Sequence, residues 1–267
     1  MNIVVLIKEV PDMTKVKFDR ERGVVDRAGA PAEINPFDEN AIQAALNLKK
    51  TKENVTITVV TMGPLRAEKS LRMAYAKGVD KMVLVSDRAF GGSDTFATAR
   101  VLAAALKNIE NIDLIICGEK SVDGDTAQVG AEVAEFLNIP HSYYVDKIDF
   151  NDPLDGEVII EIEHISGNRQ ERKMKTPCLV SVSKNIAKPQ LPTLKRKLES
   201  LDKEISVFTI KDIKGLNKEN TGFNGSPTKV SKIVVPGEIV RESIIYRDDV
   251  NDFLDKVEEV LASKGVL

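Results

Sequence analysis

Four short apolar runs in the first half of the chain are separated by amphipathic stretches. The runs are Asn2–Ile7, Val55–Thr61, Lys81–Val85 and Asp113–Cys117, and each is rich in aliphatic residues. Continuous apolar runs of this length are typical of parallel strands buried on both faces. Because helical patterns lie between them, the sequence predicts an α/β fold with a doubly wound, mostly parallel sheet. Right-handed connections then place the loops and any ligand at the carboxyl ends of the strands.

Each of these predicted strands leads into a predicted helix with one apolar face. The first helix begins at Pro36, whose missing N–H costs nothing in a first turn, and Asn35 suits the capping position before it. The second helix passes through Leu71 and closes at Gly78. The third spans Phe96–Lys107. Helices between consecutive strands are what a doubly wound sheet requires.

The second half of the chain changes from this alternation to a predicted hairpin extension. Val158–His164 and Pro177–Val182 are predicted strands on either side of the polar turn Ser166–Gln170. His164 has no Cys or carboxylate at metal-ligand spacing, so we expect it at the surface. A smaller hairpin is predicted over Phe18–Asp26.

We expect two functional parts, a nucleotide- or flavin-binding domain over 1–184 and a partner-recognition loop with a C-terminal arm over 185–267. Between 183 and 237 the sequence shows little regular periodicity. Leu191 lies between two prolines, as an exposed apolar side chain in a stiff loop. The arm ends in a predicted amphipathic helix, Val250–Ala262. A compact domain seldom carries so long a stretch without packing of its own, so we predict that the arm folds against another chain.

The stretch 113–140 combines a buried strand, a turn of small residues and a helix. Gly118 ends the strand, and small and polar residues fill 119–126. In this geometry backbone N–H groups and a helix N-terminus point at an anion. An ordinary capped connection is the alternative, with Asp125 or Thr126 as the cap. Neither the GxxxxGK nor the GxGxxG phosphate loop is present in the sequence.

A second Gly-rich stretch, Ser86–Thr98, has the same two interpretations. Asp94, Thr95 and Thr98 cluster at a predicted helix N-terminus, where a phosphate would gain about 0.3–2 kcal/mol from the helix dipole. The alternative is an N-cap with a flexible lead-in. Arg88 is either a cation facing a ligand or a solvated surface residue.

Composition narrows the classes of function. The chain has 267 residues, a net charge of −3 and two cysteines. The acidic balance argues against a nucleic-acid binder, and two cysteines in apolar runs argue against a disulfide framework. Lys8 interrupts the N-terminal apolar run too early for a signal peptide, and no apolar run approaches the length of a membrane span. We therefore expect a cytoplasmic protein.

Three stretches together resemble the beta subunit of electron-transfer flavoproteins. They are Asn35–Asp38, Thr61–Pro64 and Gly118–Gly130. Their order, spacing and strand–loop–helix setting agree with the family, and the likeness runs nearly the whole length of the chain. The family signature between Gln170 and Ser181 is kept in part, because Arg172 stands where an aliphatic residue is expected.

The resemblance leaves two cofactors in view. One group of these subunits holds AMP as a structural ligand, and the electron-bifurcating group holds FAD there. The run Ser86–Phe90 followed by Gly92–Thr98 resembles the flavin-binding segment of the bifurcating group. A single phosphate could be held by the turn Asp123–Gln128 alone, whereas a diphosphate also gives the helix start at Ser93–Thr98 something to bind. We therefore favour FAD.

The resemblance implies that the flavin, and no side chain, carries the chemistry. NADH would pass a hydride to the beta-subunit FAD. One electron would go to ferredoxin or flavodoxin, and the other through FAD on an alpha subunit to a flavin dehydrogenase, such as one of the acyl-CoA dehydrogenase type. The chain would then be an oxidoreductase component, active only with its partners. The alternatives are a subunit that holds AMP structurally and a nucleotide sensor of the universal-stress type.

The resemblance also implies the residues of the site. Those expected around the adenosine are Leu6, Asn35, Pro36, Phe37, Asp38, Met62, Lys120, Ser121, Val122, Asp123, Gly124, Asp125, Thr126, Ala127, Gln128, Val129, Gly130 and Ala131. Asp94, Thr95 and Thr98 would hold the diphosphate. Arg88 would lie near the isoalloxazine, where a cation stabilises reduced, anionic flavin, and Leu191 would anchor the dehydrogenase.

Overall fold

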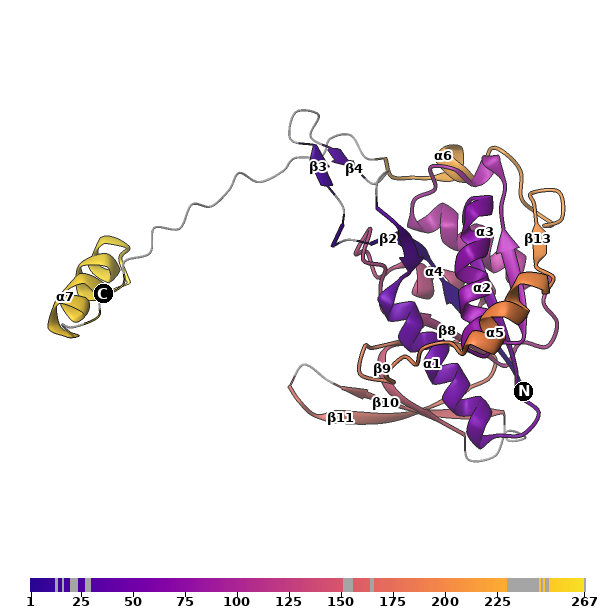
Figure 1. Cartoon of the computed structure of the whole chain (residues 1–267), viewed down its shortest axis with the longest axis horizontal. Coiled ribbons are helices and arrows are strands. Elements are labelled where there is room, and N and C mark those ends of the chain that lie inside the picture. Colours follow the sequence, from indigo (N-terminus) through magenta and orange to yellow (C-terminus); the bar gives the residue numbers. More distant parts are fainter. Residues whose placement is uncertain are drawn as a thin grey trace. The chain divides into compact units, whose positions relative to one another are not determined.

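The computed structural model describes residues 1–12, 14–15, 17–19, 24–26, 30–150, 156–163, 166–229, 245, 247 and 250–266. The chain divides into two compact units, Met1–Lys232 and Ile233–Leu267. Figure 1 draws the elements of both units along the chain.

The first unit is built on one large sheet, which among the described residues has nine strands in the order β11-β10-β9-β12-β8-β1-β6-β7-β13. The strands are β1 Asn2–Ile7, β6 Thr56–Met62, β7 Lys81–Val85, β8 Leu114–Gly118, β9 His141–Asp149, β10 Glu157–Glu163, β11 Arg169–Lys175, β12 Cys178–Val182 and β13 Ser206–Phe208. Pairing is parallel from β9 through to β13, and antiparallel between β9, β10 and β11. The predicted doubly wound, mostly parallel sheet is therefore confirmed.

The first four helices of this unit lie in the stretches where the sequence predicts helices. The helices described in the unit are α1 Pro36–Thr51, α2 Glu68–Lys77, α3 Thr95–Leu106, α4 Val129–Leu137, α5 Leu194–Glu199 and α6 Gly222–Gly225, with short 3-10 turns at Leu65–Ala67, Arg88–Phe90 and Ser200–Asp202. Gly78 ends α2 with a positive φ of 138°, as a helix-closing glycine does. The apolar spacing of the sequence thus located the first four helices.

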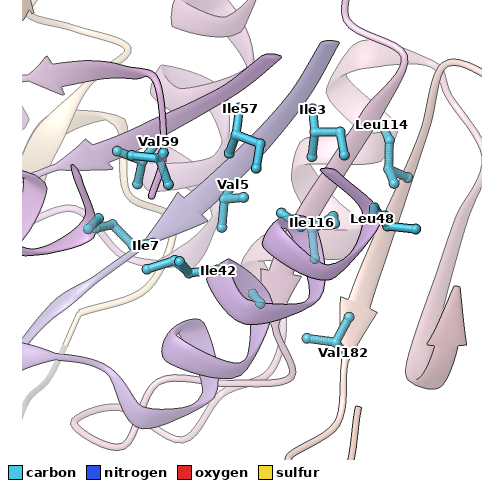
Figure 2. Packing of buried hydrophobic residues seen from close by; sticks show 14 of the residues in the cluster. Ile3, Val5, Ile7, Ile42, Leu48, Ile57, Val59, Leu114, Ile116 and Val182 are labelled. Atoms are coloured by element: carbon cyan, nitrogen blue, oxygen red, sulfur yellow. The ribbon is translucent and has the colours of Figure 1, made fainter. Parts of the chain in front are cut away.

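Both faces of the central strands are buried, and β1 shows why its sequence is apolar throughout. Ile3, Val5 and Ile7 pack in one cluster with α1 and α2, and Figure 2 shows them beside Ile42 of α1. Val4 and Leu6 pack in a second cluster with α3 and α4. Because successive side chains of a strand point to opposite faces, each of the two helical layers takes every second residue.

The predicted hairpin extension of the sheet is present, but its second strand differs from the predicted one. Val158 and its neighbours do form a strand, but β10 pairs with β11, a charged segment that was expected to begin as a turn. β12 returns to the middle of the sheet, parallel to β8 and β9, and all five of its residues are buried. A strand with no exposed residue needs neighbours on both sides, whereas the charged β11 suits an exposed edge.

Two small antiparallel pairs lie outside the large sheet. β2 Glu9–Pro11 pairs with β5 Ala32–Ile34, and β3 Lys17–Asp19 pairs with β4 Val24–Asp26. The pairing of β3 with β4 confirms the small hairpin predicted over Phe18–Asp26. The expectation for His164 lies outside the described residues.

The stretch after residue 183 has more regular structure than its sequence suggested. β13 joins the edge of the sheet beside β7, and Arg196 of α5 donates to the carbonyl oxygens of Tyr75 and Val79 at the end of α2. Residues 185–229 thus pack within the first unit, because they supply their own strand and helix contacts. The partner-binding role that we assigned to 185–267 stays a prediction.

The second unit contributes α7 Val250–Ser263, close to the predicted terminal helix. Its apolar side chains Phe253, Leu254 and Val260 are about half exposed. Across the residues that the structure describes, none of the helices has the length and apolar character needed to cross a membrane.

We expect Ile57→Ala to lower the free energy of unfolding by about 2–5 kcal/mol, because Ile57 is fully buried in the cluster under α1 and α2 and its loss leaves a cavity. Leu65→Ala is the control, since that side chain is 68% exposed. Urea unfolding followed by circular dichroism measures both. Equal midpoints for the two variants would contradict the packing described.

Candidate functional site

The candidate site lies where the carboxyl ends of β1 and β8 meet. From β1 the chain proceeds outward to β6 and β7 and then returns to β8 on the other side of β1. This is a switch point of a doubly wound sheet, where ligands bind outside the strand ends. The loops that leave β1 and β8, and the start of α1, all converge there.

Asn35 occupies the N-cap position of α1, as predicted, and its side chain connects these segments. Its backbone carbonyl begins α1 by accepting from Asp38 N, but its side chain does not cap the helix within the described structure. Instead Nδ2 donates to the carbonyl oxygen of Lys120 at 2.8 Å, and Oδ1 accepts from Val122 N at 3.2 Å. The fully buried amide therefore fixes the shape of the turn after β8.

Two ion pairs hold the same turn. Lys8 Nζ lies 2.8 Å from Asp123 Oδ2, and Lys120 Nζ lies 2.8 Å from Asp125 Oδ1. Burial acts to raise the pKa of Asp123, but the contacts with Lys8, together with hydrogen bonds from Ser121 and the backbone, outweigh it and hold that pKa below its ordinary value. Lys120 also lies 5.8 Å from the centre of the Phe37 ring. Two ammonium groups thus border a turn of small residues.

The helix that follows the turn begins without the predicted cap. Gln128, and neither Asp125 nor Thr126, precedes α4, and no side chain in the described structure caps the helix from that position. The Ala131 N–H is taken by the hydroxyl of Tyr143 at 3.0 Å. The first-turn N–H groups of α4 before Ala131 lack a side-chain cap from this position, and that arrangement suits an anionic ligand.

The start of α3 is different, because protein groups already occupy it. Asp94 Oδ1 accepts from Ala97 N at 3.0 Å, and Oδ2 accepts from the backbone N–H and the hydroxyl of Thr228. Asp94 N in turn donates to Ser226 Oγ. Burial opposes ionisation, but these hydrogen bonds hold the pKa of Asp94 below its ordinary value. Asp94 is therefore a helix cap that also anchors the segment around Thr228.

Thr95 brings the two helix starts together. Its hydroxyl lies 3.1 Å from Gln128 Oε1 and 3.2 Å from Glu132 Oε1, both on or next to α4. The Phe96 and Phe136 rings pack 5.2 Å apart behind this contact. Thr98 is half-buried in the first turn of α3. The starts of α3 and α4 are thus neighbours.

The remaining expected residues lie on the loops or strand ends of this edge, with one exception. Leu6 is a buried residue near the end of β1, and Met62 is the last residue of β6. Arg88 is exposed in the 3-10 turn after β7. Leu191 is 92% exposed in the loop before α5. The expected nucleotide residues therefore belong to one edge of the sheet, and Leu191 belongs to another surface.

Sequence reasoning missed several residues that shape the site. Lys8 directly follows β1, and that position alone was the available signal. Tyr143 and Thr228 contribute through contacts that join distant segments, so local patterns carry no signal for them.

Comparison with known proteins agrees with the fold. Residues 22–213 match the model of the electron transfer flavoprotein domain. The chain is 40% identical over 232 residues to the electron transfer flavoprotein subunit beta of Clostridium acetobutylicum, a match that covers 87% of each chain. It is 34% identical over 267 residues to the caffeyl-CoA reductase-Etf complex subunit CarD of Acetobacterium woodii, covering all of both chains. It is 35% identical to protein FixA of Azotobacter vinelandii, covering 98% of this chain and 94% of that one.

The fold and the converging helix starts define a doubly wound α/β protein with a switch-point site. Within that class, the family match and these identities show that the chain belongs to the electron transfer flavoprotein family. Its role in electron transfer follows from that membership.

We expect Asn35→Ala to loosen the turn after β8, because it leaves the Lys120 carbonyl and the Val122 N–H without their partner. An unsatisfied buried group costs about 1–3 kcal/mol. Amide hydrogen exchange at Val122 should become faster than in the wild type. Asn47→Ala is the control, since Asn47 is exposed and its amide contacts Gln43 of the same helix and not the turn after β8. Unchanged exchange at Val122 would refute the bridging role.

Proposed function

We propose that the chain is the beta subunit of a heterodimeric electron-transfer flavoprotein and that it holds FAD at the carboxyl edge of its sheet. The observation that carries the proposal is the contact of Thr95 with Gln128, which sets the starts of α3 and α4 side by side. A diphosphate is an anion long enough to contact two adjacent helix starts, whereas one phosphate needs a single one.

The chain's own groups suit the adenosine end of such a ligand. The turn 120–131 is shaped by Asn35 and bordered by the ammonium groups of Lys8 and Lys120. A planar adenine would lie among Phe37 and the backbone of the turn, and its phosphate would take the uncapped N–H groups of α4. FAD, when bound, would supply the redox chemistry by accepting a hydride from NADH and releasing electrons one at a time.

The second helix start would hold the diphosphate through hydroxyl and backbone groups. Thr98 would offer a donor to phosphate oxygens, and Thr95 would do so by turning its hydroxyl away from Gln128 and Glu132. The Asp94 carboxylate is an acceptor and so contributes by capping α3. Arg88, exposed in the loop before α3, would place its charge beside the isoalloxazine. A nearby cation stabilises a reduced, anionic ring.

Two relatives' names support the partner part of the proposal. One relative is a subunit of a caffeyl-CoA reductase-Etf complex, and another, from Anaerotignum propionicum, is the acryloyl-CoA reductase electron transfer subunit gamma. We infer that electrons divide between a low-potential ferredoxin or flavodoxin and a flavin dehydrogenase, reached through FAD on an alpha subunit. The exposed apolar side chains of α7 would pack on that subunit.

A subunit that holds AMP as a structural ligand is the second candidate. The observation in its favour is that Asp94, Ser226 and Thr228 already satisfy one another at the start of α3. Only the start of α4 would then be open to an anion, and AMP has a single phosphate. The two candidates differ in how many flavins the heterodimer contains.

We expect two flavins per heterodimer in the wild type, measured from the visible spectrum and the protein concentration. Thr95→Val and Thr98→Val should each deplete one of them, because a phosphate oxygen loses a donor at about 1–3 kcal/mol. Arg88→Ala should keep both flavins and shift one reduction potential. One flavin in the wild type would indicate AMP, and none a nucleotide sensor.

Thr193→Val is the matched control for the threonine variants, because its hydroxyl caps α5 through Arg196 N at a different surface. Its flavin content should equal that of the wild type. Two flavins retained in both Thr95→Val and Thr98→Val would remove the diphosphate assignment from α3.

We expect Leu191→Ala to slow electron transfer to the partner dehydrogenase while NADH oxidation with artificial acceptors is unchanged. Burying this fully exposed side chain in a partner's pocket would make its loss cost about 2–4 kcal/mol, read from the ratio of kcat/KM values. Val207→Ala on the exposed part of β13 is the control. Equal rates with the dehydrogenase would show that the loop is only a linker.

A further inference from the structure

The carboxylate of Asp38, in the first turn of α1, joins the ends of the two strands at the switch point. Oδ2 accepts from Lys8 N at 2.7 Å, directly after β1, and Oδ1 accepts from Gly118 N at 3.0 Å, at the end of β8. The side chain is almost completely buried, with 5% exposed. Both carboxylate oxygens thus already accept from the chain's own backbone, which differs from the expected role of Asp38 as a contact of the adenosine.

Gly118 is the residue that lets Asp38 come so close. A Cβ on Gly118 would lie 2.6 Å from Asp38 Oδ1 and 2.6 Å from Phe37 Cβ. Distances this short do not occur between real atoms of these kinds, so the missing side chain is a requirement of the contact. The start of α1 is therefore seated directly on the end of β8.

The two N–H groups that Asp38 holds are the points from which the site loops leave the sheet. Lys8 carries the ammonium group that pairs with Asp123, and Gly118 is followed two residues later by Lys120, whose carbonyl Asn35 holds. We infer that Asp38 is a positioning residue, which fixes both loops for the nucleotide without touching it. This inference rests on the proposed nucleotide site.

The charge of Asp38 is what allows it to hold both loops. A carboxylate accepts with both oxygens, whereas a protonated carboxyl turns one oxygen into a donor that faces an N–H group. Burial raises the pKa of Asp38 to about 7, against the lowering effect of the hydrogen bonds from Lys8, Asn35 and Gly118. One of the two hydrogen bonds that Asp38 accepts therefore weakens as the pH falls through this value.

Other titratable groups lie on the elements packed around Asp38. The test must distinguish their effect on the pH dependence of binding from the effect of Asp38. Burial raises the pKa of the neighbouring Cys117 thiol to about 12, so that group stays neutral below pH 8. Among the described residues, the charged groups on the loops and helix that meet at this edge include Lys8, Glu9, Glu39, Glu119, Lys120 and Asp123. Comparing the wild type with a variant that lacks only the charge of Asp38 isolates the contribution of that charge to binding.

The probe for the test is AMP, because its adenylate is common to AMP and FAD. Isothermal titration of the nucleotide-stripped heterodimer gives Kd between pH 6 and 8. In the wild type, Kd should rise roughly tenfold as the pH falls, beyond the part due to the AMP phosphate. Asp38→Asn should bind about tenfold more weakly at pH 8 and should keep only the phosphate's own dependence.

Asp113→Asn is the matched control, since Asp113 Oδ2 accepts from Asn2 N at the opposite ends of the same two strands. It should bind AMP like the wild type at every pH. If Asp38→Asn has the affinity and pH profile of the wild type, the inference is overturned. If the wild type binds neither AMP nor FAD, it is the proposed function that fails.

Infrared difference spectra provide a second measurement that does not depend on the folding of Asp38→Asn. At pH 7 the wild-type heterodimer should show a protonated carboxyl band that weakens when AMP is added, because the bound state requires ionised Asp38. The same change should persist in Asp113→Asn. A wild-type spectrum without that change would overturn the inference.

Discussion

The architecture around the site depends on one contact, the seating of the α1 start between the ends of β1 and β8. Parallel strands expose unpaired N–H groups where they end, and Asp38 takes one from each strand. Without it, two part-buried donors would lack this acceptor. Because α1 also covers one face of the sheet, the same contact fixes its helical layer relative to the site.

Burial of the Asp38 carboxylate is unfavourable for stability at neutral pH, and its hydrogen bonds offset only part of that cost. The pKa of Asp38 rises from 3.8 to about 7 on folding, so the folded chain binds more protons than the unfolded chain between these values. The contribution of this group to stability therefore falls as the pH rises through that window and stays lower above it. A neutral residue would avoid the cost, but it could not accept from both Lys8 and Gly118. An ionised carboxylate can serve as the common hydrogen-bond acceptor of both loops.

Local patterns predicted the parts of the fold whose side chains face a single environment. β1, β6, β7 and β8 are apolar because both faces are buried, and their limits were predicted to within one or two residues. The strand β11 was not predicted, and its first two residues were placed in the turn Ser166–Gln170, because an edge strand with charged residues lacks an apolar signal. The predicted site residues were found through family resemblance. Their contacts were not predictable, since Asn35 acts on a turn about eighty-five residues away.

The two helix starts of the site have similar sequence patterns but different structures, because their tertiary contacts differ. Both stretches offered an acidic or hydroxyl residue before a helix, and both were open to interpretation as a cap or as an anion site. At α3, Asp94 became the cap and also tied down Thr228. At α4, the left-handed residues Asp125 and Ala127 carry the chain away from a capping position. In the proposed site, an uncapped start beside a capped one would distinguish the two phosphates of FAD. The nearer phosphate would take the first-turn N–H groups of α4, and the second would rely on the threonine hydroxyls of α3.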